Sequence, residues 1–367
     1  MTKYKLLNVF TIFLLISLSN YSIAQTTVKP CGPTELDRVA NSKAMLYAKT
    51  HSTQVLPGTL IRVFFHICAD NNGNNLALQP TQIEPEFTAL VNAYRSDNVC
   101  FVKMGQEVIN NSSLNDSTNG SAGAGAGFPY LAYNYSGNIN VWYVNNIRGA
   151  NPSNNGGGFG GITFGSPNNY CLVAASNVGD NNTIAHEVGH ALGLLHTFDT
   201  AAGKEMINGA NSTTAGDRVP DTPADPYAYL AKSCYSASGC NYTGSCPDPN
   251  NQTNFTPPYS NRMGYWACVK PLIFTNGQFA RVNSFISTSQ MLIDCTSPSN
   301  FTVPPGSYGG KYFQSAINTL TTDNNTVTMS GIVKASLGGA HVHLLPGFHA
   351  SPSLNSSFVR IESSPCN

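Results

Sequence analysis

One short stretch of the chain, residues 186–196, combines three histidines and a glutamate at spacings that suit a metal centre. His186 and His190 are four residues apart, so a helix would place both imidazoles on one face, within reach of one ion. Gly193 can leave the helix through a positive φ, which would turn His196 back as a third ligand. Three imidazoles with an open fourth coordination position are typical of catalytic zinc.

The glutamate in this stretch, Glu187, lies between the two helical histidines and is placed to contact a water molecule beside the metal. Its carboxylate could accept a proton from that water and pass it to a leaving amine, which is general acid–base catalysis of peptide hydrolysis. The simpler alternative is a chance His-Glu-x-x-His pattern in a structural helix. The additional Gly193 and His196 make that alternative much rarer, so we predict zinc-dependent hydrolysis.

The whole stretch follows the metzincin consensus, and its surroundings resemble the pappalysin family, in particular the cytophagalysin-like bacterial branch. Residues 216–223 resemble the Asp-Thr-Pro motif of that branch, residues 261–265 its Asn-x-Met-x-Tyr motif, and residues 274–278 the start of its last helix. The resemblance covers residues 56–295. It implies an α+β metzincin zinc-protease fold, with a mixed twisted sheet, an active-site helix and an irregular, disulfide-linked C-terminal subdomain.

The resemblance also implies roles for residues outside the central stretch. Met263 would form an apolar floor beneath the zinc, and Tyr265 would help to stabilise the oxyanion of the tetrahedral intermediate. Calcium would bind near Asp217 and Asp221. For Asp221 the simpler alternative is a turn cap before Pro223.

The ten cysteines fit an oxidising compartment, and spacing alone does not give their pairing. From the resemblance we predict the disulfides Cys240–Cys268 and Cys234–Cys246. Residues 266–268 lack the acid that family members with a preference for a basic residue after the cut typically carry, which argues against that preference.

Two further segments bear on substrate binding and latency. Residues 157–161 resemble the glycine-rich approach to the family's edge strand, which would bind substrate by β-augmentation; the alternative is a flexible loop. Cys31 could place a thiolate at the fourth zinc position and keep a zymogen latent. The alternative is a structural half-cystine, for instance paired with Cys68, Cys100 or Cys171.

The first 24 residues predict export. Lys3 and Lys5 precede an apolar run, and Ala24 ends a small-residue cleavage site, as in a signal peptide. The run is shorter than the roughly 20 residues that span a bilayer, which disfavours the alternative of a membrane anchor. We therefore predict a secreted protein, extracellular or at the cell surface, without stable membrane insertion. Its 19 basic and 19 acidic residues cancel, which argues against nucleic acid and leaves a protein or peptide as the expected partner.

The elements that must position these residues follow from hydrophobic patterning. Apolar runs predict strands at 60–67, 99–104, 139–144 and 170–174, and helical spacing predicts helices through residues 87–94, from 182 onward and over 274–293. Residues 105–137 are rich in turn residues and predict a surface excursion. The tail resembles a short β-stack from the ends of secreted Bacteroidetes proteins, which implies a small all-β module. The predicted divisions are a signal peptide (1–24), a pro-segment or N-terminal extension (25–55), a catalytic domain (56–296), a linker (297–307) and the β module (308–367).

Taken together, these features predict a secreted zinc metalloendopeptidase. The alternative is a catalytically inactive metzincin-fold protein that binds to or adheres at a surface. The presence of all three ligands together with the base favours the enzyme.

Overall fold

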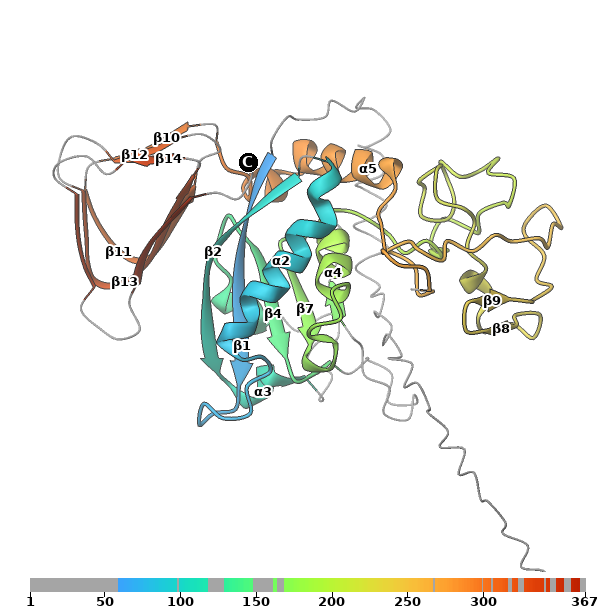
Figure 1. Cartoon of the computed structure of the whole chain (residues 1–367), viewed down its shortest axis with the longest axis horizontal. Helices are drawn as coiled ribbons and strands as arrows, with labels where there is room; N and C mark the ends of the chain where they lie inside the picture. Colours follow the sequence, from blue (N-terminus) through green and yellow to red (C-terminus); the bar gives the residue numbers. More distant parts are fainter. Residues whose placement is uncertain are drawn as a thin grey trace, which may run out of the picture.

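A mixed five-stranded sheet occupies the centre of the molecule (Figure 1). Its strand order is β2-β1-β4-β7-β6, with β6 antiparallel to β7 at one edge and the other neighbours parallel. The parallel strands are nearly continuous apolar runs because both of their faces are covered. The strands are β1 (Thr59–Ala69), β2 (Val99–Asn110), β4 (Ile139–Val144), β6 (Gly161–Thr163) and β7 (Tyr170–Ala174).

The computed structural model describes the chain from Thr59 onward, with several gaps. The predicted signal peptide, Cys31 and most of the stretch 157–161 lie outside the described residues. No helix in the described part is long and apolar enough to cross a membrane. The described residues are 59–97, 99–117, 129–147, 161–163, 168–266, 268–298, 300–304, 306–315, 319–322, 327–339, 341–343, 348–352 and 358–363.

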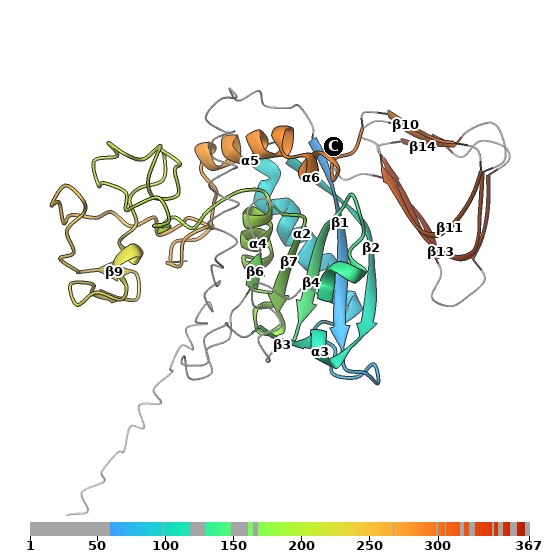
Figure 2. The ribbon, with the colours of Figure 1, turned by 180° about the vertical axis from the view of Figure 1, so that it is seen from behind.

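Two helices, α2 (Ile83–Tyr94) and α4 (Thr183–Ala191), pack side by side on one face of the sheet, and the reverse view shows the opposite face (Figures 1 and 2). Alternate residues of β1, such as Val63 and Phe65, bury against these helices in the main core. The helix α5 (Asn276–Thr288), followed by α6 (Gln290–Ile293), lies across one end of the sheet and contributes its apolar side to the same core.

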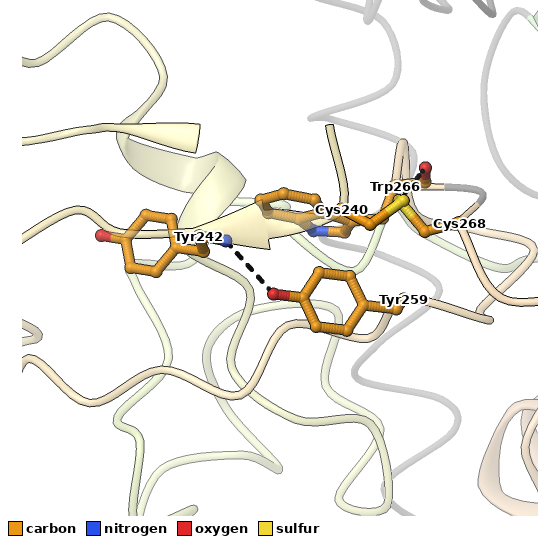
Figure 3. The surroundings of a disulfide bond; sticks show 5 residues. All are labelled: Cys240, Tyr242, Tyr259, Trp266 and Cys268. Carbon is orange, nitrogen blue, oxygen red and sulfur yellow. Dashed lines mark hydrogen bonds between the residues drawn. A yellow bond between two sulfur atoms is a disulfide. The ribbon is translucent and has the colours of Figure 1, made fainter. Parts of the chain in front are cut away.

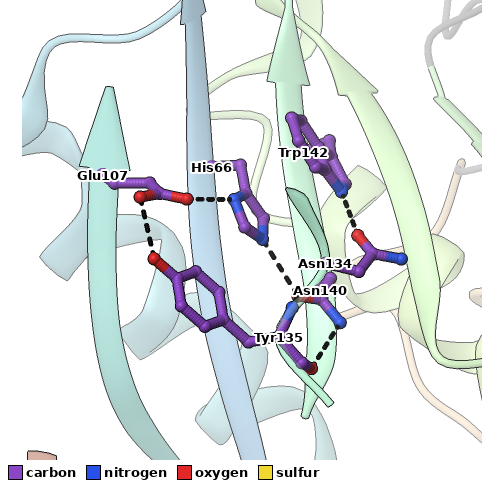
Figure 4. A network of polar contacts seen from close by, with 6 residues as sticks. All are labelled: His66, Glu107, Asn134, Tyr135, Asn140 and Trp142. Carbon is purple, nitrogen blue, oxygen red and sulfur yellow. Dashed lines mark hydrogen bonds and ion pairs between the residues drawn. The ribbon is translucent and has the colours of Figure 1, made fainter. Parts of the chain in front are cut away.

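The opposite face of the sheet contains a buried polar network within an aromatic cluster (Figure 4). His66 on β1 is fully buried, stacks on Trp142 at 4.0 Å between ring centroids, and places Nδ1 3.2 Å from Glu107 Oε1. The Asn140 amide group donates to backbone carbonyls, so its Oδ1 faces His66 and accepts a hydrogen bond from Nε2 at 2.9 Å. Tyr135 donates its hydroxyl to the other Glu107 oxygen. The imidazole is therefore held between two acceptors.

The structure confirms some predicted elements and corrects others. The strands at 139–144 and 170–174 have the predicted bounds. The excursion predicted from residue 105 is wrong at its start, because β2 keeps pairing with β1 through Asn110. The helix predicted over 274–293 is broken at Ser289, whose extended backbone starts α6 separately, as serine often does at a helix start.

Residues 199–275 form a subdomain with little regular structure, to the right of the sheet in Figure 1. Two disulfides cross-link it, Cys234–Cys246 and Cys240–Cys268, the same pairs that we predicted from the resemblance. Near the second disulfide, the backbone N–H of Tyr242 donates a hydrogen bond to the hydroxyl of Tyr259 (Figure 3). Trp266 lies two residues before Cys268 in the chain. The short elements of this and the preceding region are α3 (Ser112–Asn115), β3 (Asp116–Ser117), β5 (Asn146–Ile147), β8 (Ala237–Ser238) and β9 (Asn241–Tyr242).

The described tail consists of strands that pair in parallel, beyond the β2 edge of the sheet in both views (Figures 1 and 2). One sheet has the order β10-β12-β14, and in the other β13 pairs with β11, β15 and β16. The strands are β10 (Asn300–Val303), β11 (Gly306–Ser315), β12 (Thr319–Thr322), β13 (Val327–Gly339), β14 (His341–His343), β15 (Phe348–Pro352) and β16 (Phe358–Ser363).

Candidate active site

The helix α4 presents the first two histidines of the candidate site. Its first turn is capped by Asp180, whose Oδ1 accepts the backbone N–H groups of Asn182 and Thr183 at 2.8 Å each. The apolar residues of α4 bury against the sheet and α2, which fixes the rotation of the helix. In this orientation, His186 and His190 lie on the side of α4 that faces the subdomain of residues 199–275.

The third histidine returns to the site because α4 ends in a tight turn at Gly193. Gly193 has a φ of +98°, and the N–H of Leu194 donates to the carbonyl of Gly189, which closes the helix end. From α5, Arg281 donates its Nε–H to the carbonyl of Gly193 at 2.7 Å. The chain then runs back past the helix and brings His196 beside the other two histidines.

The three imidazoles converge on one point. Their Nε2 atoms lie 3.1–3.2 Å apart, close to the separation of about 3.3 Å expected for tetrahedral ligands with Zn–N bonds of about 2.05 Å. Nδ1 of His186 donates to the carbonyl of Arg262, and Nδ1 of His190 to that of Leu194, so both Nε2 atoms keep their lone pairs. Lone pairs gathered in this way fit a bound cation.

Burial keeps these three imidazoles neutral. Desolvation lowers the pKa of His186 to about 3 and of His190 to about 4, and with repulsion from the other two histidines it holds the pKa of His196 well below its ordinary value. Neutral imidazole is the form that binds zinc, so the site needs no proton loss at neutral pH. In the part of the chain that the structure describes, this is the only group of three or more His, Cys, Asp or Glu side chains close enough for one ion.

Glu187 is fully buried on α4, next to the first histidine. The hydroxyl of Thr163 on the edge strand β6 lies 3.1 Å from Glu187 Oε2 and 2.9 Å from its backbone oxygen. No sequence pattern marks Thr163, because a three-residue strand is too short to produce a periodic signal.

The segment around Met263 closes the site from the other side. Met263 is fully buried, and a Cβ on Gly189 of α4 would lie 2.9 Å from its Sδ, so the methionine packs directly against the helix. Asn261 accepts the backbone N–H of Met263 and exchanges two amide hydrogen bonds with Gln278 of α5. The hydroxyl of Tyr265 lies 3.1 Å from His196 Nε2. The structure thus brings both residues of the predicted Met-x-Tyr segment to the histidines.

The two aspartates predicted near calcium have separate surroundings. Asp217 is fully buried and accepts hydrogen bonds from the Thr222 hydroxyl and the Val219 N–H, and desolvation raises its pKa to about 7. Asp221 instead accepts the hydroxyl of Thr275 and the N–H of Gly277. The observed contacts of Asp221 are therefore those of a cap for the start of α5, not of the turn before Pro223.

Three comparisons place these observations among known proteins. Residues 160–287 match a peptidase family model described as Pregnancy-associated plasma protein-A. An extracellular metalloprotease of Podospora anserina is 36% identical over 115 residues, 30% of this chain and 31% of that protein. One of Arthroderma benhamiae is 28% identical over 51% of this chain and 61% of its own length, so the matches span less than two thirds of these two relatives.

A third relative and one solved structure extend the comparison. An extracellular metalloprotease of Arthroderma gypseum is 26% identical over 65% of this chain and 78% of its own length. A promirolysin variant of Tannerella forsythia has a TM-score of 0.48 and 17% identity, covering 72% of this chain and 95% of that one. The segment that carries all three histidines, Glu187 and the Met263 turn is thus the one that matches the peptidase family.

Proposed function

We propose that the protein is a secreted zinc-dependent endopeptidase that hydrolyses peptide bonds in proteins. The observation that carries this proposal is the convergence of three neutral imidazoles beside a buried glutamate. The match to a peptidase family supports a metalloprotease. Zinc fits the donor set, because neutral nitrogen ligands at this separation suit it better than they suit calcium or magnesium, which prefer oxygen.

The three histidines would hold the ion, and the ion would supply Lewis-acid polarisation of the scissile carbonyl and of water. Glu187 would accept the proton of the attacking water and deliver it to the leaving amine. The Tyr265 hydroxyl, 3.1 Å from His196 Nε2, is placed to donate to the oxyanion of the tetrahedral intermediate. Met263 supports the ligands by packing under α4.

Substrate would bind along β6, the last strand in the sheet order, whose outer edge could pair with an extended peptide. Besides the histidines, Tyr265 packs against the uncharged rings of Phe198 and Tyr227, and Tyr227 in turn packs against Trp266. We propose that the residue after the cut is not a basic one, because Asp225 beside them is buried and engaged by Thr197 and Trp266.

Several finer parts of the proposal rest on the sequence. These are the cytophagalysin-like branch, export by residues 1–24, latency through Cys31 and a separate β module after residue 307. Calcium at Asp217 also stays a proposal. Its support is a buried carboxylate with a raised pKa close to Glu205, whose pKa burial raises to about 8 with a further contribution from Asp217.

The decisive experiment compares the purified protein with Glu187→Ala. The wild type should contain about one zinc and cleave a generic protein substrate, and Glu187→Ala should keep the zinc and lose cleavage. Asp116→Ala, at the end of α3, removes an exposed carboxylate and should cleave normally. Cleavage by Glu187→Ala at the wild-type rate would refute the assigned base, and a zinc-loaded but inactive wild type would favour the surface-binding alternative.

A further inference from the structure

We infer that the edge strand β6 positions the general base: Thr163 and Gly161 together hold the Glu187 carboxylate in its working place. The inference rests on the proposed function, because it assigns Glu187 the role of the base. It gives β6 a second role besides any contact with substrate. Thr163 and Gly161 are positioning residues, since they act through Glu187.

The register of the sheet places both residues on the same side as α4. Gly161 pairs with Val173 and Thr163 with Cys171 across the β6–β7 ladder. Val173 and Cys171 are fully buried in the core beneath the helices. Because neighbouring positions on paired strands share a face, Gly161 and Thr163 also face α4, which packs against β6 and β7.

Thr163 contacts Glu187 at both ends of the residue. Its Oγ1 lies 2.9 Å from the Glu187 backbone oxygen and 3.1 Å from Oε2. A hydroxyl carries one proton, and an ionised carboxylate is the stronger acceptor of the two. Threonine is also branched at Cβ, so few χ1 rotamers are available to it and the hydroxyl stays in place. The hydroxyl therefore donates to the carboxylate from a position fixed beside the Glu187 backbone.

Gly161 provides the space that the carboxylate occupies. A Cβ at this position would lie 2.5 Å from Cγ and 2.6 Å from Cδ of Glu187, distances that real Cβ atoms do not reach. The φ of Gly161 lies outside the positive range, so the backbone does not require glycine here. Glycine is needed because the Glu187 side chain occupies the space in which a side chain at position 161 would lie.

A third residue near the Glu187 carboxylate, Cys171, is uncharged. Burial raises the pKa of the Cys171 thiol well above its ordinary value, and the nearby Glu187 raises it further, so the thiol stays neutral beside the carboxylate. The surroundings of the Glu187 carboxylate are thus a glycine without a side chain, a hydroxyl donor and a neutral thiol. A group held in one orientation before the reaction avoids the cost of reorienting during it, which makes kcat the sensitive quantity.

The test uses the full chain and four variants. Thr163→Val keeps the shape and removes the hydroxyl, Thr163→Ser keeps the hydroxyl, and Gly161→Ala displaces the carboxylate. Thr296→Val is the control: it makes the same chemical change at a hydroxyl that donates to the backbone carbonyl of Ile293 and not to Glu187. Zinc content, thermal unfolding, kcat and KM are measured for each.

Thr163→Val and Gly161→Ala should lower kcat about 10- to 100-fold, as loss of outer partners of a metal site does, while zinc content and KM stay near wild type. Thr163→Ser should retain most of the wild-type kcat, and Thr296→Val all of it. An unchanged kcat in Thr163→Val, with the wild type active, overturns the inference and leaves the proposed function intact.

An inactive, zinc-loaded wild type would contradict the proposed function instead. In that case crystal structures of the wild type and Thr163→Val decide the present inference. It requires the Glu187 carboxylate to leave its position when the hydroxyl is removed, and an identical side-chain conformation overturns it.

Discussion

Gly193 is the point at which backbone conformation and the metal site depend on each other, and Gly193→Ala should damage both. Its φ of +98° strains any residue with a Cβ, at a cost of about 1–3 kcal/mol. A Cβ there would also overlap the ring of Phe285 on α5, with Cγ and Cε2 each 2.7 Å away. Overpacking of this kind costs about 1–3 kcal/mol, so the free energy of unfolding should fall by about 2–6 kcal/mol.

The matched control is Gly203→Ala. Gly203 has nearly the same φ, +99°, and nothing within 4 Å of a built Cβ, so this variant isolates the backbone strain. The free energies of unfolding of the two variants, measured with denaturant, should therefore differ by about 1–3 kcal/mol, which is the packing contribution alone. In a Phe285→Ala background the ring is absent, so Gly193→Ala and Gly203→Ala should lower the free energy of unfolding by similar amounts relative to Phe285→Ala alone.

The same substitution should weaken the metal site, because the turn at Gly193 delivers His196. We expect zinc affinity, measured by competition with a chelator, to fall about 10- to 100-fold in Gly193→Ala and to stay at the wild-type level in Gly203→Ala. Equal stability losses in the two variants, with zinc affinity unchanged in both, would refute the reasoning.

Three further predictions concern other parts of the molecule. Glu107→Leu removes the carboxylate partner of buried His66 and should lower the free energy of unfolding by about 2–4 kcal/mol without loss of zinc; a change within experimental error would speak against the network in Figure 4. Replacing Cys240 and Cys268 by serine opens a cross-link of sequence separation 28 and should cost about 3.5 kcal/mol on the chain-entropy account, measured by thermal unfolding under non-reducing conditions. Burial raises the folded-state pKa of Glu205 from 4.5 to about 8, so the folded state binds its proton more tightly than the unfolded state and stability should fall as pH rises from 6.5 to 8. Glu205→Gln should flatten that fall in a melting-temperature series, and an unchanged slope would show that the folded state holds no extra proton on Glu205 in this window.

The sequence predicted the elements of the centre of the fold from local pattern alone. The strands at 139–144 and 170–174 are short apolar runs, and Thr275 with Gln278 forms a capping box at the start of α5, so pattern and capping chemistry carry enough information. Hydrophobic pattern did not predict the edge strand β6, because three residues after a glycine-rich stretch have no periodicity; only the resemblance of residues 157–161 implied an edge strand here. Pairing with β7 alone makes it a strand.

The grouping of the three histidines follows from the sequence alone. His186 and His190 are four apart on a helix and Gly193 allows the turn to His196, so the spacing already contains most of the geometry. The environment of these groups, in contrast, arises from the tertiary fold. The carbonyl of Arg262 that fixes the His186 tautomer is 76 residues away, and the Thr163 hydroxyl is 24 residues from Glu187. Contacts of this kind depend on how the sheet and the Met263 turn close around α4, and no local pattern encodes them.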